Sequence, residues 1–140
     1  MIVLDTNIIL ETMRAAPDQN VVAWLNRQDM KTLYLTAVSL AELRFGIAQL
    51  NDGKAKTDLA ERLDRALDLV FQGRVVPFTA DAAKVFADRM ATARRLGRGV
   101  GFQDGMIAAS VAALGFTIAT RDTSPFEAMG VSVINPFDAS

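Results

Sequence analysis

Four acidic residues stand where strands or helices of this chain are expected to begin or end: Asp5, Glu42, Asp104 and Asp122. Each closes or follows an apolar strand-like run or opens a helix-like one, so folding can bring all four to one edge of a sheet. Neighbouring carboxylates repel by roughly 1 kcal/mol per pair in water and about 4 kcal/mol at intermediate dielectric. A cluster of them therefore stays ionised only beside a cation, which predicts a metal site.

The residue types that are missing narrow the chemistry further. The chain has 140 residues and contains no cysteine and no histidine. These absences exclude disulfides, thiolate or imidazole zinc sites, cysteine nucleophiles, Ser-His-Asp triads and histidine acid/base catalysis. Carboxylate oxygens remain as the main catalytic groups, and such hard ligands favour Mg²⁺ or Mn²⁺ over zinc or copper. We therefore expect Mg²⁺ or Mn²⁺ as the cofactor.

The composition is that of one globular unit. Apolar residues make up 51% of the sequence and the net charge is −1. A chain of this size can bury a core without disulfides, so we expect a single domain over residues 1–140. No basic field would attract nucleic acid over the whole surface, so any such contact must be local. The start lacks a basic leader and no apolar run approaches about 20 residues, which predicts a cytoplasmic protein without a membrane segment.

Strand-like and helix-like segments alternate along the chain. Short apolar runs predict strands at 2–4, 33–38, 75–78, 116–120 and 131–134. Helical spacing with start and stop signals predicts helices near 8–12, 17–25, 39–50, 59–72, 80–96, 103–114 and 124–130. Alternation of this kind implies right-handed crossovers and an α/β fold, with a parallel sheet of about five strands covered on both faces. The strand at 75–78 is expected at an edge because it contains Pro77.

Each acid also has a structural explanation. Asp5 could cap the helix that follows it. Ser39-Leu40-Ala41-Glu42 matches a capping box, which would direct the Glu42 side chain to the Ser39 backbone N–H. Asp104 lies in the first turn of a helix, where the helix dipole stabilises a carboxylate. Asp122 could be a loop residue. The four together, at these element positions, favour the metal site.

Several arginines are candidates for phosphate binding. Arg95 and Arg98 lie beside a glycine-rich loop that precedes Asp104. Arg44 and Arg121 are each close in sequence to a candidate metal ligand and are the better candidates. Arg89 is assigned to a solvated helix face near a helix C-terminus.

Four segments carry a family resemblance. They are Ile-Val-Leu-Asp-Thr-Asn at 2–7, Ser-Leu-Ala-Glu-Leu-Arg-Phe-Gly at 39–46, Asp-Gly-Met-Ile-Ala-Ala at 104–109 and Ala-Thr-Arg-Asp at 119–122. In this order and spacing they resemble the PIN-domain ribonucleases, and most closely the VapC-type toxins, over essentially the whole chain. The resemblance implies a PIN-like three-layer α/β/α fold.

The resemblance also implies roles for particular residues. The acidic quartet of the family, which holds one or two Mg²⁺ or Mn²⁺ ions, falls on Asp5, Glu42, Asp104 and Asp122. The supporting polar positions of the family fall on Thr6, Asn7 and Thr120. Gly105 departs from the alanine usual after the third acid, and glycine costs up to about 1 kcal/mol in a helix.

The function implied by the resemblance is metal-dependent cleavage of RNA, often a tRNA or an rRNA. Family members act as toxins held inactive by a cognate antitoxin, and they are commonly homodimers. A partner is therefore expected to cover an apolar groove formed by the early helices.

Two other functions remain open from the sequence. One is an aspartyl-nucleophile phosphatase, although Asp5-Thr6-Asn7 lacks the second acid that such enzymes place two residues further on. The other is a noncatalytic RNA- or protein-binding domain, which the presence of all four acids disfavours.

Overall fold

In the computed structural model, which describes residues 1–138, five parallel strands form one sheet in the order β3-β2-β1-β4-β5. The strands are β1 Ile2–Leu4, β2 Leu33–Thr36, β3 Val75–Val76, β4 Thr117–Ala119 and β5 Ser132–Ile134. The predicted parallel sheet is confirmed, and β3, the strand that precedes Pro77, lies at an edge as expected. It ends at Val76, because a proline has no N–H to continue the ladder.

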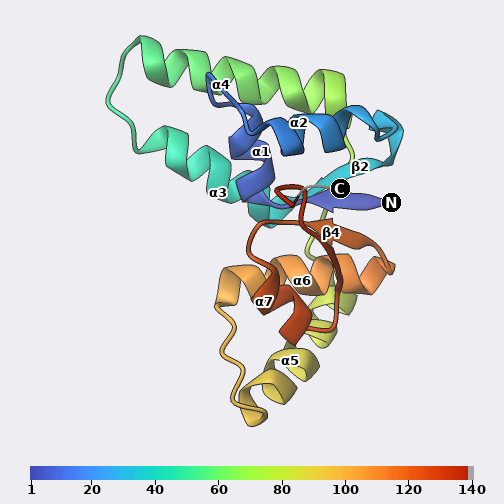
Figure 1. The fold of residues 1–140 in the computed structure, drawn as a ribbon. Coiled ribbons are helices and arrows are strands. Elements are labelled where there is room, and N and C mark those ends of the chain that lie inside the picture. Colours follow the sequence, from blue (N-terminus) through green and yellow to red (C-terminus); the bar gives the residue numbers. More distant parts are fainter. Residues whose placement is uncertain (139–140) are drawn as a thin grey trace.

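Helices cover both faces of this sheet (Figure 1). They are α1 Thr6–Thr12, α2 Gln19–Asn26, α3 Ala37–Ala48, α4 Lys54–Ala66, α5 Ala80–Arg95, α6 Phe102–Leu114 and α7 Thr123–Ala128. A 3₁₀ turn, η1 Met30–Thr32, precedes β2, and a π-helical segment, η2 Leu67–Phe71, continues α4. Helices α1 to α4 lie on one side of the sheet and α5 to α7 on the other, which gives three layers. Within residues 1–138, no helix is both long enough and apolar enough to cross a membrane.

The central strand β1 is buried on both faces, as its continuous apolar run predicts. Leu4 packs in the core formed with α1 to α4, whereas Val3 packs in the core formed with α6 and α7. Successive strand residues point to opposite faces, so one short strand supplies both cores. Phe126 of α7 is fully buried in the second core and fixes this short helix against the sheet.

The expected capping box at Ser39 does not form. Strand β2 ends at Thr36, and the Thr36 hydroxyl accepts a hydrogen bond from the Ser39 backbone N–H at 3.0 Å. Thr36 has the extended backbone of an N-cap, so α3 begins at Ala37, two residues before the predicted start. Glu42 is thereby released from the capping role that its sequence context suggests.

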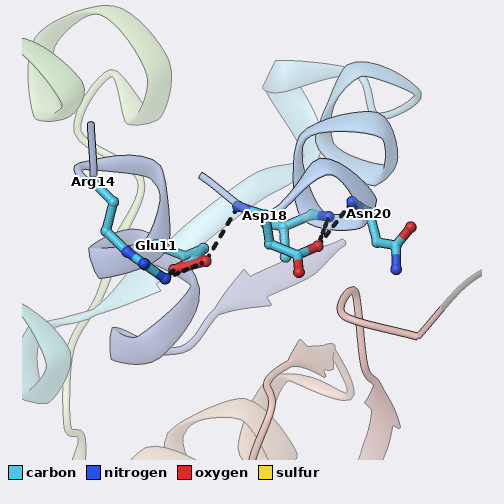
Figure 2. A network of polar contacts seen from close by, with 5 residues as sticks. Glu11, Arg14, Asp18 and Asn20 are labelled. Carbon is cyan, nitrogen blue, oxygen red and sulfur yellow. Dashed lines mark hydrogen bonds and ion pairs between the residues drawn. The ribbon is translucent and has the colours of Figure 1, made fainter. Parts of the chain in front are cut away.

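A buried carboxylate joins α1 to α2 (Figure 2). Glu11 is only 4% exposed, and both of its carboxylate oxygens accept from the Arg14 guanidinium at 3.1 Å. The same carboxylate accepts from the Asp18 backbone N–H at 3.2 Å, while the Asp18 side chain caps α2 by accepting from the backbone N–H groups of Asn20 and Val21. These bonds satisfy a buried charge and hold the turn between the two helices.

The strand order places a crevice beside β1. From β1 the chain proceeds through β2 to β3 on one side of the sheet, and β4 and β5 lie on the other side. The point where the order reverses lies between the carboxyl ends of β1 and β4. In open parallel sheets this switch point is where ligands bind.

Candidate active site

Asp5 lies at this switch point, where it caps α1 and also binds the segment that follows β4. It directly follows β1, and its backbone N–H donates to the Ala119 carbonyl of β4 at 3.0 Å. One carboxylate oxygen accepts from the Thr6 backbone N–H at 2.8 Å and caps α1. The other accepts from the Thr120 hydroxyl at 2.8 Å, and the residue is only 4% exposed. The capping role and the site role are therefore compatible, because each uses a different oxygen.

A small polar network holds the ends of β1 and β4 together around Asp5. The buried Thr120 hydroxyl accepts from the Asn7 side-chain amide and from the Asp122 backbone N–H, each at 3.1 Å, while it donates to Asp5. The Asn7 side-chain oxygen in turn accepts from the Arg121 backbone N–H at 3.1 Å. The network fixes the orientation of Asp5 and links it to the segment that carries Asp122.

Burial and neighbouring charge both act on Asp5. Burial raises the pKa of its carboxyl group, and the charges of Asp104 and Asp122 raise it further. The hydrogen bonds from Thr120 and Thr6 oppose this rise, because they stabilise the ionised form. The hydrogen bonds thus fix the orientation of Asp5, and no ion pair within residues 1–138 balances its charge.

Glu42 comes from the second turn of α3 and faces the same acids. Burial raises its pKa first, followed by the charges of Asp5 and Asp104, while the Thr6 hydroxyl lowers it. The Thr6 hydroxyl lies near but makes no hydrogen bond, so both it and the buried Glu42 carboxylate oxygen Oε1 have no hydrogen-bond partner within the described residues. A buried acceptor without a partner needs an explanation, and a bound cation would satisfy it.

Asp104 and Asp122 complete the group. Asp104 lies in the first turn of α6, and burial followed by the charge of Asp122 raises its pKa. Asp122 is exposed at the position preceding α7, where its side chain makes no capping hydrogen bond. The structure therefore brings all four predicted acids to the carboxyl edge of the sheet. There the charges of Asp104 and Asp122 act on Asp5, those of Asp5 and Asp104 act on Glu42, and that of Asp122 acts on Asp104.

The predicted phosphate-binding arginines have different surroundings. Arg44 pairs with Asp64 of α4 at 2.8 Å, and the Arg121 guanidinium lies 3.7 Å from the centre of the Phe137 ring. Arg95 donates to the Thr92 hydroxyl. Arg98 lines a hollow that also contains Asp104 and Asp122.

Arg89 is partly buried and its guanidinium binds the end of α7, which corrects its assignment to a solvated helix face. Its guanidinium donates to the Met129 carbonyl at 2.8 Å and also to the Gly130 carbonyl at 3.3 Å. These are orphan carbonyls at the end of α7, which a cation stabilises. This contact joins α5 to α7 across about forty residues of sequence. A contact over such a separation cannot be predicted from local sequence patterns.

A hollow lined by Glu42, Phe45 and Gln103 lies against α3 and α6, and two further hollows adjoin the acids. One, of about 450 Å³, is polar and is lined by Arg98, Gly99, Gly101, Asp104, Asp122, Ser124, Pro125, Glu127 and Ala128. The other, of about 360 Å³, is mainly apolar and is lined by Thr6, Leu10, Met13, Glu42, Leu43, Gly46, Ile47, Leu50 and Leu59. Sequence reasoning missed Ser124 and Glu127 as site residues, because α7 showed only its start and stop signals.

Known proteins resemble this chain over its whole length. The PIN domain family matches residues 2–131. A VapC ribonuclease of Sinorhizobium fredii is 50% identical over 138 residues, which cover 99% of both chains. The toxin FitB of Neisseria gonorrhoeae is 42% identical over 137 residues, which cover 98% of this chain and 99% of FitB. A structure of FitAB bound to a DNA fragment matches with a TM-score of 0.94 and 40% identity, covering 100% of this chain and 98% of the matched one. The chain therefore belongs to the PIN-domain family, in the group of the VapC and FitB toxins.

Proposed function

We propose that this protein is a metal-dependent endoribonuclease that acts as the toxin of a toxin-antitoxin pair. The observation that carries the proposal is the group of four acids at the carboxyl edge of the sheet, three of which have raised pKa values through burial and mutual repulsion. PIN-domain VapC toxins are nucleases, and the relative from Sinorhizobium fredii is named a ribonuclease. An aspartyl-nucleophile phosphatase is less well supported, because Asn7 stands where such enzymes carry their second acid.

The donor set fits Mg²⁺ or Mn²⁺. Asp5, Glu42, Asp104 and Asp122 would hold the ion or ions through oxygen atoms alone, which hard cations prefer. Within residues 1–138, no three acidic side chains converge on one point as they lie, so ion binding would involve water ligands or changed rotamers. Mg²⁺ commonly retains several waters, so this arrangement suits it. The partnerless oxygen of Glu42 is the group that a cation would satisfy most directly.

The chemistry follows from the residues at hand. A bound ion would lower the pKa of a coordinated water and neutralise charge at the phosphate. Asp5, fixed by Thr120 and Thr6, provides an oriented and largely desolvated carboxylate. Without histidine in the chain, water rather than the RNA 2′-hydroxyl is the expected nucleophile.

The experiment that tests this proposal is incubation of the purified chain with total cellular RNA in Mg²⁺, in Mn²⁺ and in EDTA, followed by mapping of the new ends. We expect discrete cuts that require a metal and leave a 5′-phosphate and a 3′-hydroxyl. Products ending in a 2′,3′-cyclic phosphate would contradict the mechanism, because they show that the 2′-hydroxyl attacked. Failure to cut under any condition, with a folded and inhibitor-free protein, would favour a noncatalytic binding domain.

Thr120→Val tests the network around Asp5. Valine keeps the shape of threonine but removes the hydroxyl that orients Asp5 and accepts from Asn7. Loss of such a supporting contact typically costs about 10–100-fold in metal affinity or activity. We expect a fall of this size in RNA cleavage, partly restored by excess Mn²⁺. Thr57→Val, on an exposed part of α4, is the matched control, and equal activity of the two variants would contradict the positioning role.

The raised pKa values of the three acids predict how stability depends on pH and metal. The folded state binds protons more tightly than the unfolded chain, whose ordinary values are 3.8 for Asp and 4.5 for Glu. These groups therefore stabilise the fold below those values, and their contribution is lost as pH rises through the raised pKa values.

We accordingly expect the melting temperature in EDTA to fall as the pH rises above the ordinary carboxyl values of 3.8 and 4.5, and Mn²⁺ to reverse the fall. A ligand at 100 times its Kd adds about 2.7 kcal/mol of stability. Thermal unfolding at several pH values, with and without Mn²⁺, measures both effects. Equal melting temperatures with and without Mn²⁺ at neutral pH would contradict the metal site.

An antitoxin is the proposed protein partner, and the apolar hollow beside Glu42 is its proposed docking surface. Leu10 and Leu50, which line this hollow, are 49% and 39% exposed, so part of its apolar lining faces solvent. The relative FitB is named a toxin, and the matching FitAB structure is a complex. Coexpression with a small neighbouring protein should give a copurifying complex that does not cleave RNA. A complex that cleaves as fast as the free chain would contradict this part of the proposal.

A homodimer is proposed on the strength of the family and of exposed aromatic surface. Phe45 of α3 and Phe102 of α6 are 65% and 73% exposed, and aromatic side chains are enriched in protein interfaces. Sedimentation of the purified chain measures the mass directly, and a Phe45→Ser variant should shift it toward the monomer.

A further inference from the structure

The polar hollow beside the acids has two walls from different parts of the chain. One wall is the glycine-rich loop between α5 and α6, with Arg98, Gly99 and Gly101. The other is α7, which contributes Ser124 and Glu127, and Figure 1 shows α7 lying beside α6. Asp104 and Asp122 lie where the walls meet, so the hollow adjoins the proposed metal centre. Its volume of about 450 Å³ is within the range of small-molecule sites, ~300–1,000 Å³.

Three polar side chains in this hollow make no hydrogen bond or ion pair within residues 1–138 that would stabilise the fold. The Arg98 guanidinium, the Ser124 hydroxyl and the Glu127 carboxylate are exposed, and none has a hydrogen bond or an ion pair within the described part of the chain. Ser124 and Glu127 are three residues apart on α7, so both lie on one face of that helix. These groups are free to recognise a ligand.

The wall that carries Glu127 is rigid. The neighbouring Phe126 is fully buried in the core, and Arg89 of α5 donates to the carbonyls of Met129 and Gly130 just after α7. The backbone position of Glu127 relative to the acids is thus set before any ligand arrives. A carboxylate on a fixed helix reaches only the space beside that helix, which limits the ligand groups that it can contact.

A second cation is a poor occupant for the rest of this hollow. The proposed metal centre already uses Asp104 and Asp122, so Glu127 is the remaining acid in the lining. Arg98 adds a positive charge to the same space. A ligand that offers both a negative group for Arg98 and hydrogen-bond donors for Glu127 fits better, and a nucleotide has both.

We propose that this hollow binds the nucleotide next to the cleaved phosphate and selects guanine through Glu127, with Arg98 contacting that nucleotide's phosphate; this inference rests on the proposed ribonuclease function. An ionised carboxylate only accepts hydrogen bonds. Guanine presents two adjacent donors, N1–H and N2–H, on its Watson–Crick edge, which single-stranded RNA leaves open. Adenine and cytosine place an acceptor beside their donor, and uracil flanks its one donor with acceptors, so each would oppose the carboxylate.

The test is cleavage of a pool of short single-stranded RNAs of random sequence in Mn²⁺, with sequencing of the cut ends. The wild type should show guanine at one position flanking the cut, enriched at least about tenfold. Glu127→Gln should shift the preference toward adenine or cytosine, because an amide offers one donor and one acceptor. Arg98→Ala should raise KM about tenfold and leave the guanine preference unchanged. Glu61→Gln, an exposed position on α4, should behave as wild type.

Binding of free GMP and AMP, followed by NMR, separates this inference from the ribonuclease function. GMP should bind at least about tenfold more tightly than AMP, and Glu127→Gln should abolish that difference. Selective GMP binding without any RNA cleavage would overturn the ribonuclease function and keep the subsite. Cleavage without guanine selection in either assay, or a preference unchanged in Glu127→Gln, would overturn the subsite and keep the ribonuclease.

Discussion

Asp5→Asn should reduce RNA cleavage by at least about 100-fold while making the metal-free protein more stable. The carboxylate is the most buried of the four acids, and it is oriented by hydrogen bonds from Thr6 and Thr120. Replacing it by a neutral amide removes a charge that a cation needs. Since loss of a supporting contact alone costs about 10–100-fold, loss of a proposed ligand should cost at least the upper end of that range.

The expected gain in stability has the same origin. The pKa of Asp5 is raised by burial and by the charges of Asp104 and Asp122, so the ionised form is under electrostatic strain at neutral pH. Asparagine removes the charge and keeps an acceptor for the Thr6 N–H. Relief of one carboxylate pair is worth roughly 1 kcal/mol, which corresponds to a rise in melting temperature of a few degrees.

Asp68→Asn, an exposed acid on η2, is the matched control and should leave both quantities unchanged. Cleavage assays in Mn²⁺ and thermal unfolding in EDTA measure the two effects on the same preparations. An Asp5→Asn protein that cuts RNA as fast as wild type would remove Asp5 from the metal centre. A variant that loses both activity and stability would instead show that the hydrogen bond from the Thr120 hydroxyl to the second carboxylate oxygen outweighs the relief of charge repulsion, because asparagine still caps α1.

Gly105→Leu should destabilise the fold by about 1–3 kcal/mol or more and reduce cleavage with it. Gly105 is buried on α6 against α5, and a Cβ added there would lie 2.6 Å from the Met90 sulfur and 3.0 Å from a ring carbon of Phe86. The missing side chain therefore lets the two helices approach closely. Leucine would force them apart and displace the adjacent Asp104.

Gly105→Ala is the informative comparison, because it adds the Cβ and nothing more. Alanine favours the helix by up to about 1 kcal/mol, but its Cβ meets Met90, whose flexible side chain can move aside at some cost. We expect these effects nearly to cancel, and adding Met90→Ala should remove the clash. Urea unfolding of the variants measures the differences. Equal stability of Gly105→Leu and wild type would contradict the close packing of α5 on α6.

The sheet could be predicted largely from local patterns. The runs predicted at 2–4 and 116–120 are short and mainly apolar, and both contain parallel strands, at Ile2–Leu4 and Thr117–Ala119, inside a covered sheet. Pro77 correctly indicated an edge, because it cannot donate to a ladder. The boundary at Thr36 was mistaken, since Thr36 and Ser39 are both good caps and only the backbone of the folded chain decides between them.

The candidate site was harder to predict than the sheet. Sequence alone named the four acids, because their positions at element ends are visible in the chain. It could not show that Glu42 keeps a buried oxygen without a partner, nor that Arg44 pairs with Asp64. The sequence analysis did not identify Ser124 and Glu127, which line the hollow opposite the Arg98 loop. A six-residue helix is too short for its sequence pattern to indicate which face lies against a distant loop.

What the sequence by itself determined was the donor chemistry and the kinds of elements. The absence of histidine and cysteine leaves carboxylates as the main candidate metal ligands, and hydrophobic runs and turn residues define strands and helices through short-range forces. Only the tertiary structure decided which distant segments lie together. It pairs Thr120 with Asp5 and Arg89 with the end of α7, and it places the Arg98 loop and Glu127 around one hollow. These depend on the order of strands in the sheet and on close packing between helices, which arise only when the whole chain folds.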